Sequence, residues 1–128
     1  MIIEKRFPVA TRQLEYVAFF VLKIPTLEGT GHAYLACDAF SEYALYTGVE
    51  LDDNPDTILK HIYLLTEDSE FTRHINKGFT LVLNDYEELS DRINAIINPV
   101  KGKLLFDKAF NNQIAEPVRN SFGRTVKK

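Results

Sequence analysis

The stretch FTLVLNDYEELSDRINAII, residues 79–97, contains the change of hydrophobic period that decides the fold. Apolar residues alternate through FTLVLN (79–84), which predicts a β-strand. The next segment, YEELSDRINAIIN (86–98), repeats apolar residues at helical spacing, with Leu89, Ile93 and Ile96 on one face. A strand that leads directly into a helix favours a sheet whose later strands are parallel and joined by crossover helices.

Asp85 stands at the point where the period changes, and two roles are open for it. As a helix cap, its carboxylate would accept an N–H of the helix that starts at Tyr86, with Glu88 at the return position of a capping box. As a functional residue, the same carboxylate at the end of a strand would be a metal ligand. The residues around it fit either role.

Three further strands are expected before this stretch. Each is rich in β-branched and aromatic residues, and the first is nearly continuous in apolarity, which is typical of a strand buried on both faces. We expect Pro25 and the loop TLEGTG to end the first strand, and the short connection around Ser41 to join the next two as a hairpin. The three predicted strands are LEYVAFFVLKI (14–24), HAYLACDAF (32–40) and YALYTGVEL (43–51).

The rest of the chain continues the alternation of helix and strand. A helix is expected to start near Pro55, because proline suits the first helical position, and GKLLFD (102–107) is expected to be a fifth strand. The final helix is expected from about Asn112, with Pro117 interrupting it or marking its first turn. The predicted order βββαβαβα gives an α/β domain with a mixed five-stranded sheet flanked by helices.

Length and composition predict one domain. The 128 residues, 45% of them hydrophobic, can bury a sizeable core, and we expect residues 1–128 to form a single unit. No apolar run reaches the roughly 20 residues of a membrane-spanning helix, and the first residues lack the pattern of a secretory signal, so a cytoplasmic protein is expected. The one cysteine, Cys37, lies in an apolar segment and is expected to be a buried hydrophobe.

Charge is unevenly distributed. The net charge of −3 provides no overall attraction to nucleic acid, but the last twenty residues carry four basic side chains against the single acid Glu116. A basic tail over 119–128 either contacts phosphates or an acidic partner, or is a solvated and flexible terminus.

Three strings in this order resemble the catalytic core of retroviral integrases and bacterial transposases, which have the ribonuclease-H-like fold. In YLACDAFSEYALYTGVE, the second strand ends in Asp38, followed by a spacer, an aromatic residue and Ser41. In LVLNDYEEL, Asp85 follows the fourth strand, as the family's second catalytic aspartate does. In NNQIAEPVRNSF, Glu116 resembles the catalytic glutamate of the last helix. The resemblance covers about residues 13 to 122.

This resemblance implies three acids that hold two divalent metal ions for phosphoryl transfer on DNA. The first acid belongs within the first strand, but the equivalent positions here are the apolar residues around Phe19, Phe20 and Val21. The triad is therefore expected to be broken. Asp85 and Glu116 remain as vestigial catalytic candidates, and no metal is expected unless Asp85 holds one.

The leading functional hypothesis is a catalytically inactive integrase-core-like module that binds nucleic acid or a partner protein of a mobile genetic element. Its phosphate contacts would be basic residues around the fifth strand and the last helix. These are Lys101, Lys103, Arg119 and Arg124.

Two alternatives remain. One is an active Mg²⁺- or Mn²⁺-dependent nuclease or strand transferase that uses Asp85, Glu116 and a displaced third acid. The other is a homo-oligomeric assembly protein, in line with the homodimers that the resemblance implies, with an aromatic interface formed by Phe19, Phe20, Tyr43 and Tyr46. The histidines are too scattered for a local zinc motif and are expected to be structural or surface residues. Without the enzyme, no cofactor is expected.

Overall fold

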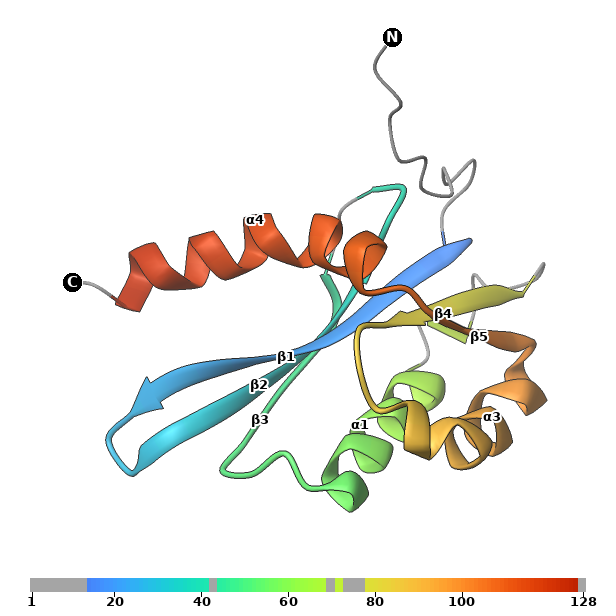
Figure 1. Ribbon diagram of the computed structural model, residues 1–128, viewed down its shortest axis with the longest axis horizontal. Helices are drawn as coiled ribbons and strands as arrows, with labels where there is room; N and C mark the ends of the chain where they lie inside the picture. Colours follow the sequence, from blue (N-terminus) through green and yellow to red (C-terminus); the bar gives the residue numbers. More distant parts are fainter. Residues whose placement is uncertain (1–13, 42–43, 69–70, 73–77, 127–128) are drawn as a thin grey trace, which may run out of the picture.

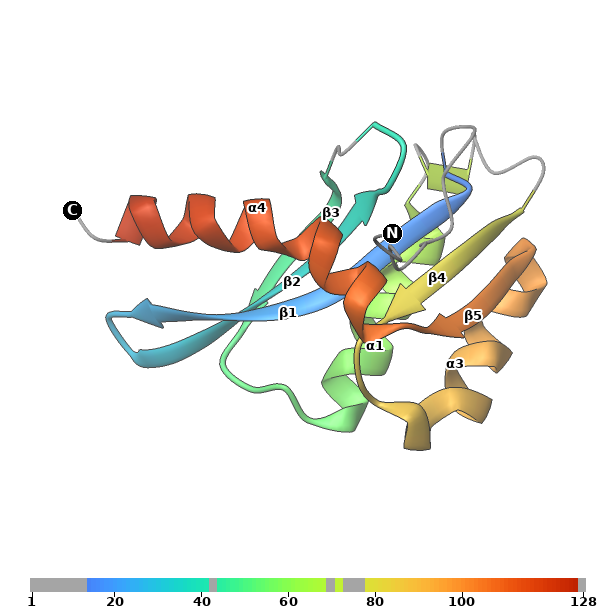
Figure 2. The same cartoon turned by 45° about the horizontal axis from the view of Figure 1, so that its top comes forward.

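A computed structural model describes residues 14–41, 44–68, 71–72 and 78–126, with side chains described as far as residue 120. The described chain forms a five-stranded sheet with helices on both faces (Figures 1 and 2). The strands are β1 (Tyr16–Thr26), β2 (Gly29–Asp38), β3 (Ala44–Glu50), β4 (Phe79–Leu83) and β5 (Gly102–Phe106). The main helices are α1 (Pro55–Glu67), α3 (Ser90–Ile97) and α4 (Lys108–Val126).

The sheet order is β3-β2-β1-β4-β5. The pairs β1–β2 and β2–β3 are antiparallel, whereas β4 is parallel to both β1 and β5. This mixed pattern follows from the connections, because short turns join the first three strands and helices join the later ones. It confirms the predicted α/β sheet of the ribonuclease-H-like fold.

The β1–β2 hairpin is longer than predicted. Pro25 lies inside β1 opposite Thr30, and the turn falls at Leu27 and Glu28 instead. A proline, which lacks an N–H, is tolerated there because β4 pairs with β1 only over 16–18. Among the described strands, none beside residue 25 on that edge of β1 therefore requires an N–H donor from it. The prediction that Pro25 ends the strand was therefore wrong.

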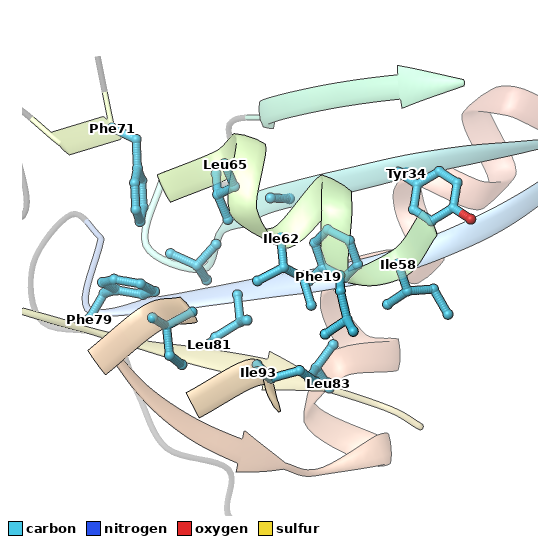
Figure 3. Close-up of a cluster of buried hydrophobic side chains, with 14 of the residues drawn as sticks. Phe19, Tyr34, Ile58, Ile62, Leu65, Phe71, Phe79, Leu81, Leu83 and Ile93 are labelled. Atoms are coloured by element: carbon cyan, nitrogen blue, oxygen red, sulfur yellow. The ribbon is translucent and has the colours of Figure 1, made fainter. Parts of the chain in front are cut away.

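One face of the sheet is covered by α1 and α3, and it holds the larger apolar cluster (Figure 3). Phe19 is fully buried at its centre and contacts Tyr34 with ring centroids 6.4 Å apart. The helix α1 contributes Ile58, Ile62 and Leu65 to this cluster, and α3 contributes Ile93, which its helical spacing predicted. Burial of this cluster is the main stabilising contribution to the fold.

The opposite face is covered in part by α4, which lies across β1 (Figures 1 and 2). Ala115 of this helix belongs to a second apolar cluster, together with Phe20 from β1 and Cys37 from β2. Burial raises the pKa of the Cys37 thiol to about 11, so the sulfur acts as the predicted buried hydrophobe. Phe19 and Phe20 are thus buried on opposite faces of the sheet and do not contribute to the expected aromatic interface, and Tyr43 lies outside the described residues.

Helix boundaries differ from the predictions in two places. The helix α1 begins at Pro55 as predicted, but the segment 86–98 is divided into a 3₁₀ turn, Glu87–Leu89, and α3. The helix α4 begins at Lys108 rather than near Asn112, because the Asp107 carboxylate accepts the Phe110 N–H at 3.0 Å and caps it.

Pro117 does not interrupt α4, which continues through it to Val126. Pro117 and Gln113, the residue four positions earlier whose carbonyl loses its partner, are both exposed, so water can satisfy that carbonyl. The predicted basic tail thus lies largely within this helix. None of the helices in the described part of the chain has both the length and the apolarity needed to cross a membrane.

Candidate functional site

Asp85 follows the end of β4 and is exposed to solvent. Its Oδ1 accepts the N–H of Tyr86 at 2.8 Å, and Tyr86 adopts a left-handed backbone with φ of 73°. This turn delays the first helical residue to Glu87, and no side chain caps that end. The predicted capping box was therefore wrong, and Asp85 stabilises the turn between strand and helix.

Glu116, the second acidic candidate, lies on the exposed side of α4. Its Oε2 is 2.9 Å from Nη1 of Arg119, one helical turn later, in a solvent-exposed pair. The residue of α4 that does meet β1 and β4 is Asn111, which is fully buried. Glu116 follows Asn111 by five positions, about 140° of additional turn at 3.6 residues per turn, so it points to a different side of the helix.

Asn111 joins the two central strands where their own pairing stops. The β1–β4 ladder ends at the pair Ala18–Val82. The Asn111 side-chain amide donates to the carbonyls of Phe19 and Val82, both at 2.9 Å. A neutral amide therefore occupies the junction of β1, β4 and α4, beside a first strand that is apolar as predicted.

Asp38, the acid of the DAFS string, is buried and holds the loop after β2. Its carboxylate accepts the N–H groups of Leu14, Phe40 and Ser41 at 3.0, 3.3 and 3.2 Å. It also accepts the Ser41 hydroxyl at 2.7 Å. Aspartate is favoured at such turns because its side chain can accept the backbone N–H groups of the residues that follow. Among the described residues, no group of three or more His, Cys, Asp or Glu side chains could hold a metal ion.

A pocket of about 210 Å³ lies at the other end of the central strands, where β1, β4 and β5 begin. The register places Tyr16, Thr80 and Lys103 directly opposite one another on three neighbouring strands, so they form a row on one face. The remaining residues of the lining include Lys101 and Glu15. The pocket thus combines two lysines, two hydroxyls and one carboxylate.

The predicted basic residues are divided by the fold. Lys101 and Lys103 line the pocket and are exposed. Arg119 lies on α4, whose C-terminal half extends away from β5 (Figures 1 and 2). The backbone of Arg124 belongs to the same helix, and its side chain lies outside the described residues. The structure therefore brings together only the two lysines.

A second polar cluster, which sequence reasoning missed, joins α1 to β3. His61 is buried, with Nε2 2.7 Å from Oε2 of Glu50 and Nδ1 2.6 Å from the Tyr46 hydroxyl. Its ring stacks on Tyr34 with centroids 4.3 Å apart. Hydrogen bonds from Lys60 and then from His61 lower the pKa of Glu50, and burial raises the pKa of Tyr46. The only sequence signal is a histidine on the apolar face of a helix.

Comparison with known proteins adds a structural likeness. No family model and no curated protein matches the sequence. The chain is similar to a chain in the cryo-EM structure of the simian T-cell lymphotropic virus intasome in complex with PP2A regulatory subunit B56 gamma, with a TM-score of 0.71 and 5% sequence identity. The match covers 94% of this chain and 42% of that chain, so this protein spans less than half of its structural neighbour. The likeness shows an integrase-like fold.

Proposed function

We propose that this chain is a catalytically inactive integrase-core-like module that binds the phosphate backbone of nucleic acid at the pocket formed by Lys101, Lys103, Tyr16 and Thr80. The whole of residues 1–128 acts as one unit in this role. In the mobile-element context that the sequence resemblance implies, it contributes binding, and any strand chemistry belongs to another protein.

The observation that carries the loss of catalysis is the placement of Asn111. Phosphoryl transfer with two metal ions needs carboxylates that converge on both cations. At the junction of β1, β4 and α4, the Asn111 amide nitrogen is engaged by two backbone carbonyls, and the next residue of β1, Phe20, is a buried apolar side chain. Asp85 is engaged by its neighbouring N–H, and Glu116 by Arg119.

The composition of the pocket supports phosphate as the ligand. Lysine ammonium groups and hydroxyls are common donors to phosphate oxygens. The volume of about 210 Å³ is below the usual range for a drug-sized ligand and suits a phosphate with part of its sugar. At about 3.3 Å per residue, the five residues of β4 separate this pocket from Asp85 by roughly 15 Å, so binding here does not require the former catalytic end.

Fluorescence anisotropy with labelled DNA duplex and labelled single strand, titrated with salt, tests the binding. The double variant Lys101→Asn/Lys103→Gln should weaken binding. It should also make the slope of log K against log salt less steep, by the contribution of up to about two neutralised phosphates. Asparagine is chosen at position 101 because it tolerates the positive φ of 66°. The matched control, Lys23→Gln/Lys108→Gln, removes two exposed charges elsewhere and should retain most of the affinity.

Two results would refute this binding site. One is no binding of either DNA at low salt. The other is equal weakening by the pocket variant and by the control. If the pocket variant loses affinity for the single strand and keeps its affinity for the duplex, the pocket binds unpaired strands.

Calorimetric titration with Mn²⁺ and Mg²⁺ tests the loss of catalysis independently. The wild-type protein and Asp85→Asn should give the same result, with no saturable site and no metal-dependent nicking of DNA. Saturable Mn²⁺ binding that Asp85→Asn abolishes would instead support the active nuclease or strand transferase.

A further inference from the structure

The strand β3 lies at one edge of the sheet, and in the described part of the chain no strand pairs with its outer side. An edge strand presents a row of backbone N–H and C=O groups that can pair with another strand. Proteins usually protect such edges with lysine, proline, bulges or a covering element. The outer edge of β3 is therefore a candidate interaction surface.

The sequence of β3, ALYTGVE, lacks these protective residues. It contains neither lysine nor proline, and its one register irregularity lies at the start, between the partners of Ala36 and Cys37. From Tyr46 to Glu50 its pairing with β2 is regular. The opposite edge strand, β5, carries the exposed Lys103. The two edges of the sheet thus differ in their protection.

The side chains of β3 on the α4 side of the sheet are uncovered. Thr47 is exposed, Val49 is 61% exposed, and Leu51, directly after the strand, is 59% exposed. The helix α4 makes its main contacts with β1 and β4, and the exposure of these β3 side chains shows that it does not cover them. An added strand would therefore find both backbone partners and apolar side chains.

The other face of β3 is fixed to the body of the protein. Tyr46 and Glu50 both bind the buried His61 of α1, at 2.6 and 2.7 Å. Gly48 between them fits directly against this ring, since a Cβ there would lie 2.7 Å from Cε1 of His61. These contacts hold the strand in an extended conformation, which lowers the entropic cost of adding a partner strand.

We propose that a second copy of this chain docks on β3 through its own β3, in antiparallel pairing centred on Gly48. This register places Thr47 beside Val49 of the second copy, a favourable pair of β-branched residues on the uncovered face. Glu50, the only charged residue of the strand, lies opposite Tyr46, so no like charges meet. The strand is thus complementary to a second copy of itself. A charged peptide is a less suitable partner, because Glu50 is the only charged residue of β3 that could attract it. The dimer does not depend on the phosphate pocket.

Sedimentation velocity over a range of protein concentrations tests the dimer. The wild-type protein and Val49→Thr, which keeps the β-branched shape, should dimerise as concentration rises. Val49→Lys should remain monomeric, because it introduces a charge at the centre of the new sheet face. Leu64→Lys places the same charge on an exposed apolar residue of α1 and should leave the dimer intact. Circular dichroism confirms folding of each variant.

Disulfide trapping tests the register. A mixture of Thr47→Cys and Val49→Cys proteins should form the mixed disulfide faster than either protein alone forms its own, because only the mixed pair lies directly opposite. The native Cys37 is buried and should not compete. A wild-type monomer at all concentrations, a dimer that Val49→Lys does not disturb, or equal trapping rates would each overturn the proposal. Lys101→Asn/Lys103→Gln should dimerise normally, which separates this test from that of nucleic-acid binding.

Discussion

The Nε2 atom of His61 on α1 lies 2.7 Å from Oε2 of Glu50 at the end of β3. The opposite ring nitrogen bonds Tyr46, so one buried imidazole joins a helix to an edge strand at two points. In the neutral tautomer that fits both bonds, the Nε2–H group donates a hydrogen bond to the Glu50 carboxylate, and Nδ1 accepts one from the Tyr46 hydroxyl. Four testable consequences follow from this cluster and from the Asn111 junction.

The variant His61→Phe should keep the stacking on Tyr34 but lose both hydrogen bonds of the ring. The Tyr46 hydroxyl would then be left half-buried without this partner, and we expect a loss of about 1–3 kcal/mol in the free energy of unfolding. Urea denaturation followed by circular dichroism measures it. Lys60→Met removes only the exposed bond to Glu50 and should have a much smaller effect. Equal losses in both variants would contradict a special role of His61.

Acid should weaken this link in a defined direction. The pKa of Glu50 is lowered in the folded protein by hydrogen bonds from Lys60 and His61, so its contribution is present above its unfolded pKa of about 4.5 and is lost as pH falls through the lower folded value. Wild-type stability should therefore decrease more between neutral pH and pH 3 than that of Glu50→Gln. Parallel pH profiles of the two proteins would show that Glu50 is not stabilised by these bonds.

Gly48→Ala should destabilise the fold, although alanine loses less conformational entropy than glycine on folding. The added Cβ would lie 2.7 Å from Cε1 and 2.9 Å from Nδ1 of His61, a ring that its partners hold in place. We expect a loss of about 1–3 kcal/mol, as for other overpacked sites. The double variant Gly48→Ala/His61→Ala gives the ring's space to the new methyl group. Gly48→Ala should therefore reduce the free energy of unfolding less in the His61→Ala protein than in the wild type. An equal reduction in both proteins would contradict the contact.

Asn111→Leu should destabilise the protein strongly. It removes both donors and leaves the carbonyls of Phe19 and Val82 buried and unpaired, which we expect to cost about 2–4 kcal/mol. Asn111→Asp is nearly the same size but places a carboxylate against two carbonyl oxygens, so it should be worse at neutral pH and recover partly in acid. If thermal and urea unfolding show both variants to be as stable as the wild type, Asn111 does not join the strands.

The order of strands and helices was predictable because each element carries its own hydrophobic period. The residues at which the elements begin and end were less predictable. Pro25 was expected to stop β1, since the sequence does not reveal that β4 pairs with only three residues of that strand. The helical start at Lys108 could have been found from Asp107, which has the side chain of a typical cap.

The functional residues were harder to predict because their partners are distant in sequence. The apolar character of β1 at Phe20 was visible directly. Asn111, however, contacts residues 92 and 29 positions away, and its local sequence, FNNQ, gives no sign of them. His61 likewise depends on partners 11 and 15 residues earlier, on another element. Lys101 and Lys103 were named from charge alone, and only the strand register brings Tyr16 and Thr80 beside them.

The bond from Asn111 to the carbonyl of Phe19 also bears on how the molecule is made. It spans 92 residues and links the first strand to the last helix. During synthesis, the early hairpins can form as soon as they leave the ribosome, but the centre of the sheet stays open until the C-terminal helix has emerged. The centre of the sheet is therefore expected to close only after α4 has been synthesised, which makes the Asn111 junction a late step of folding.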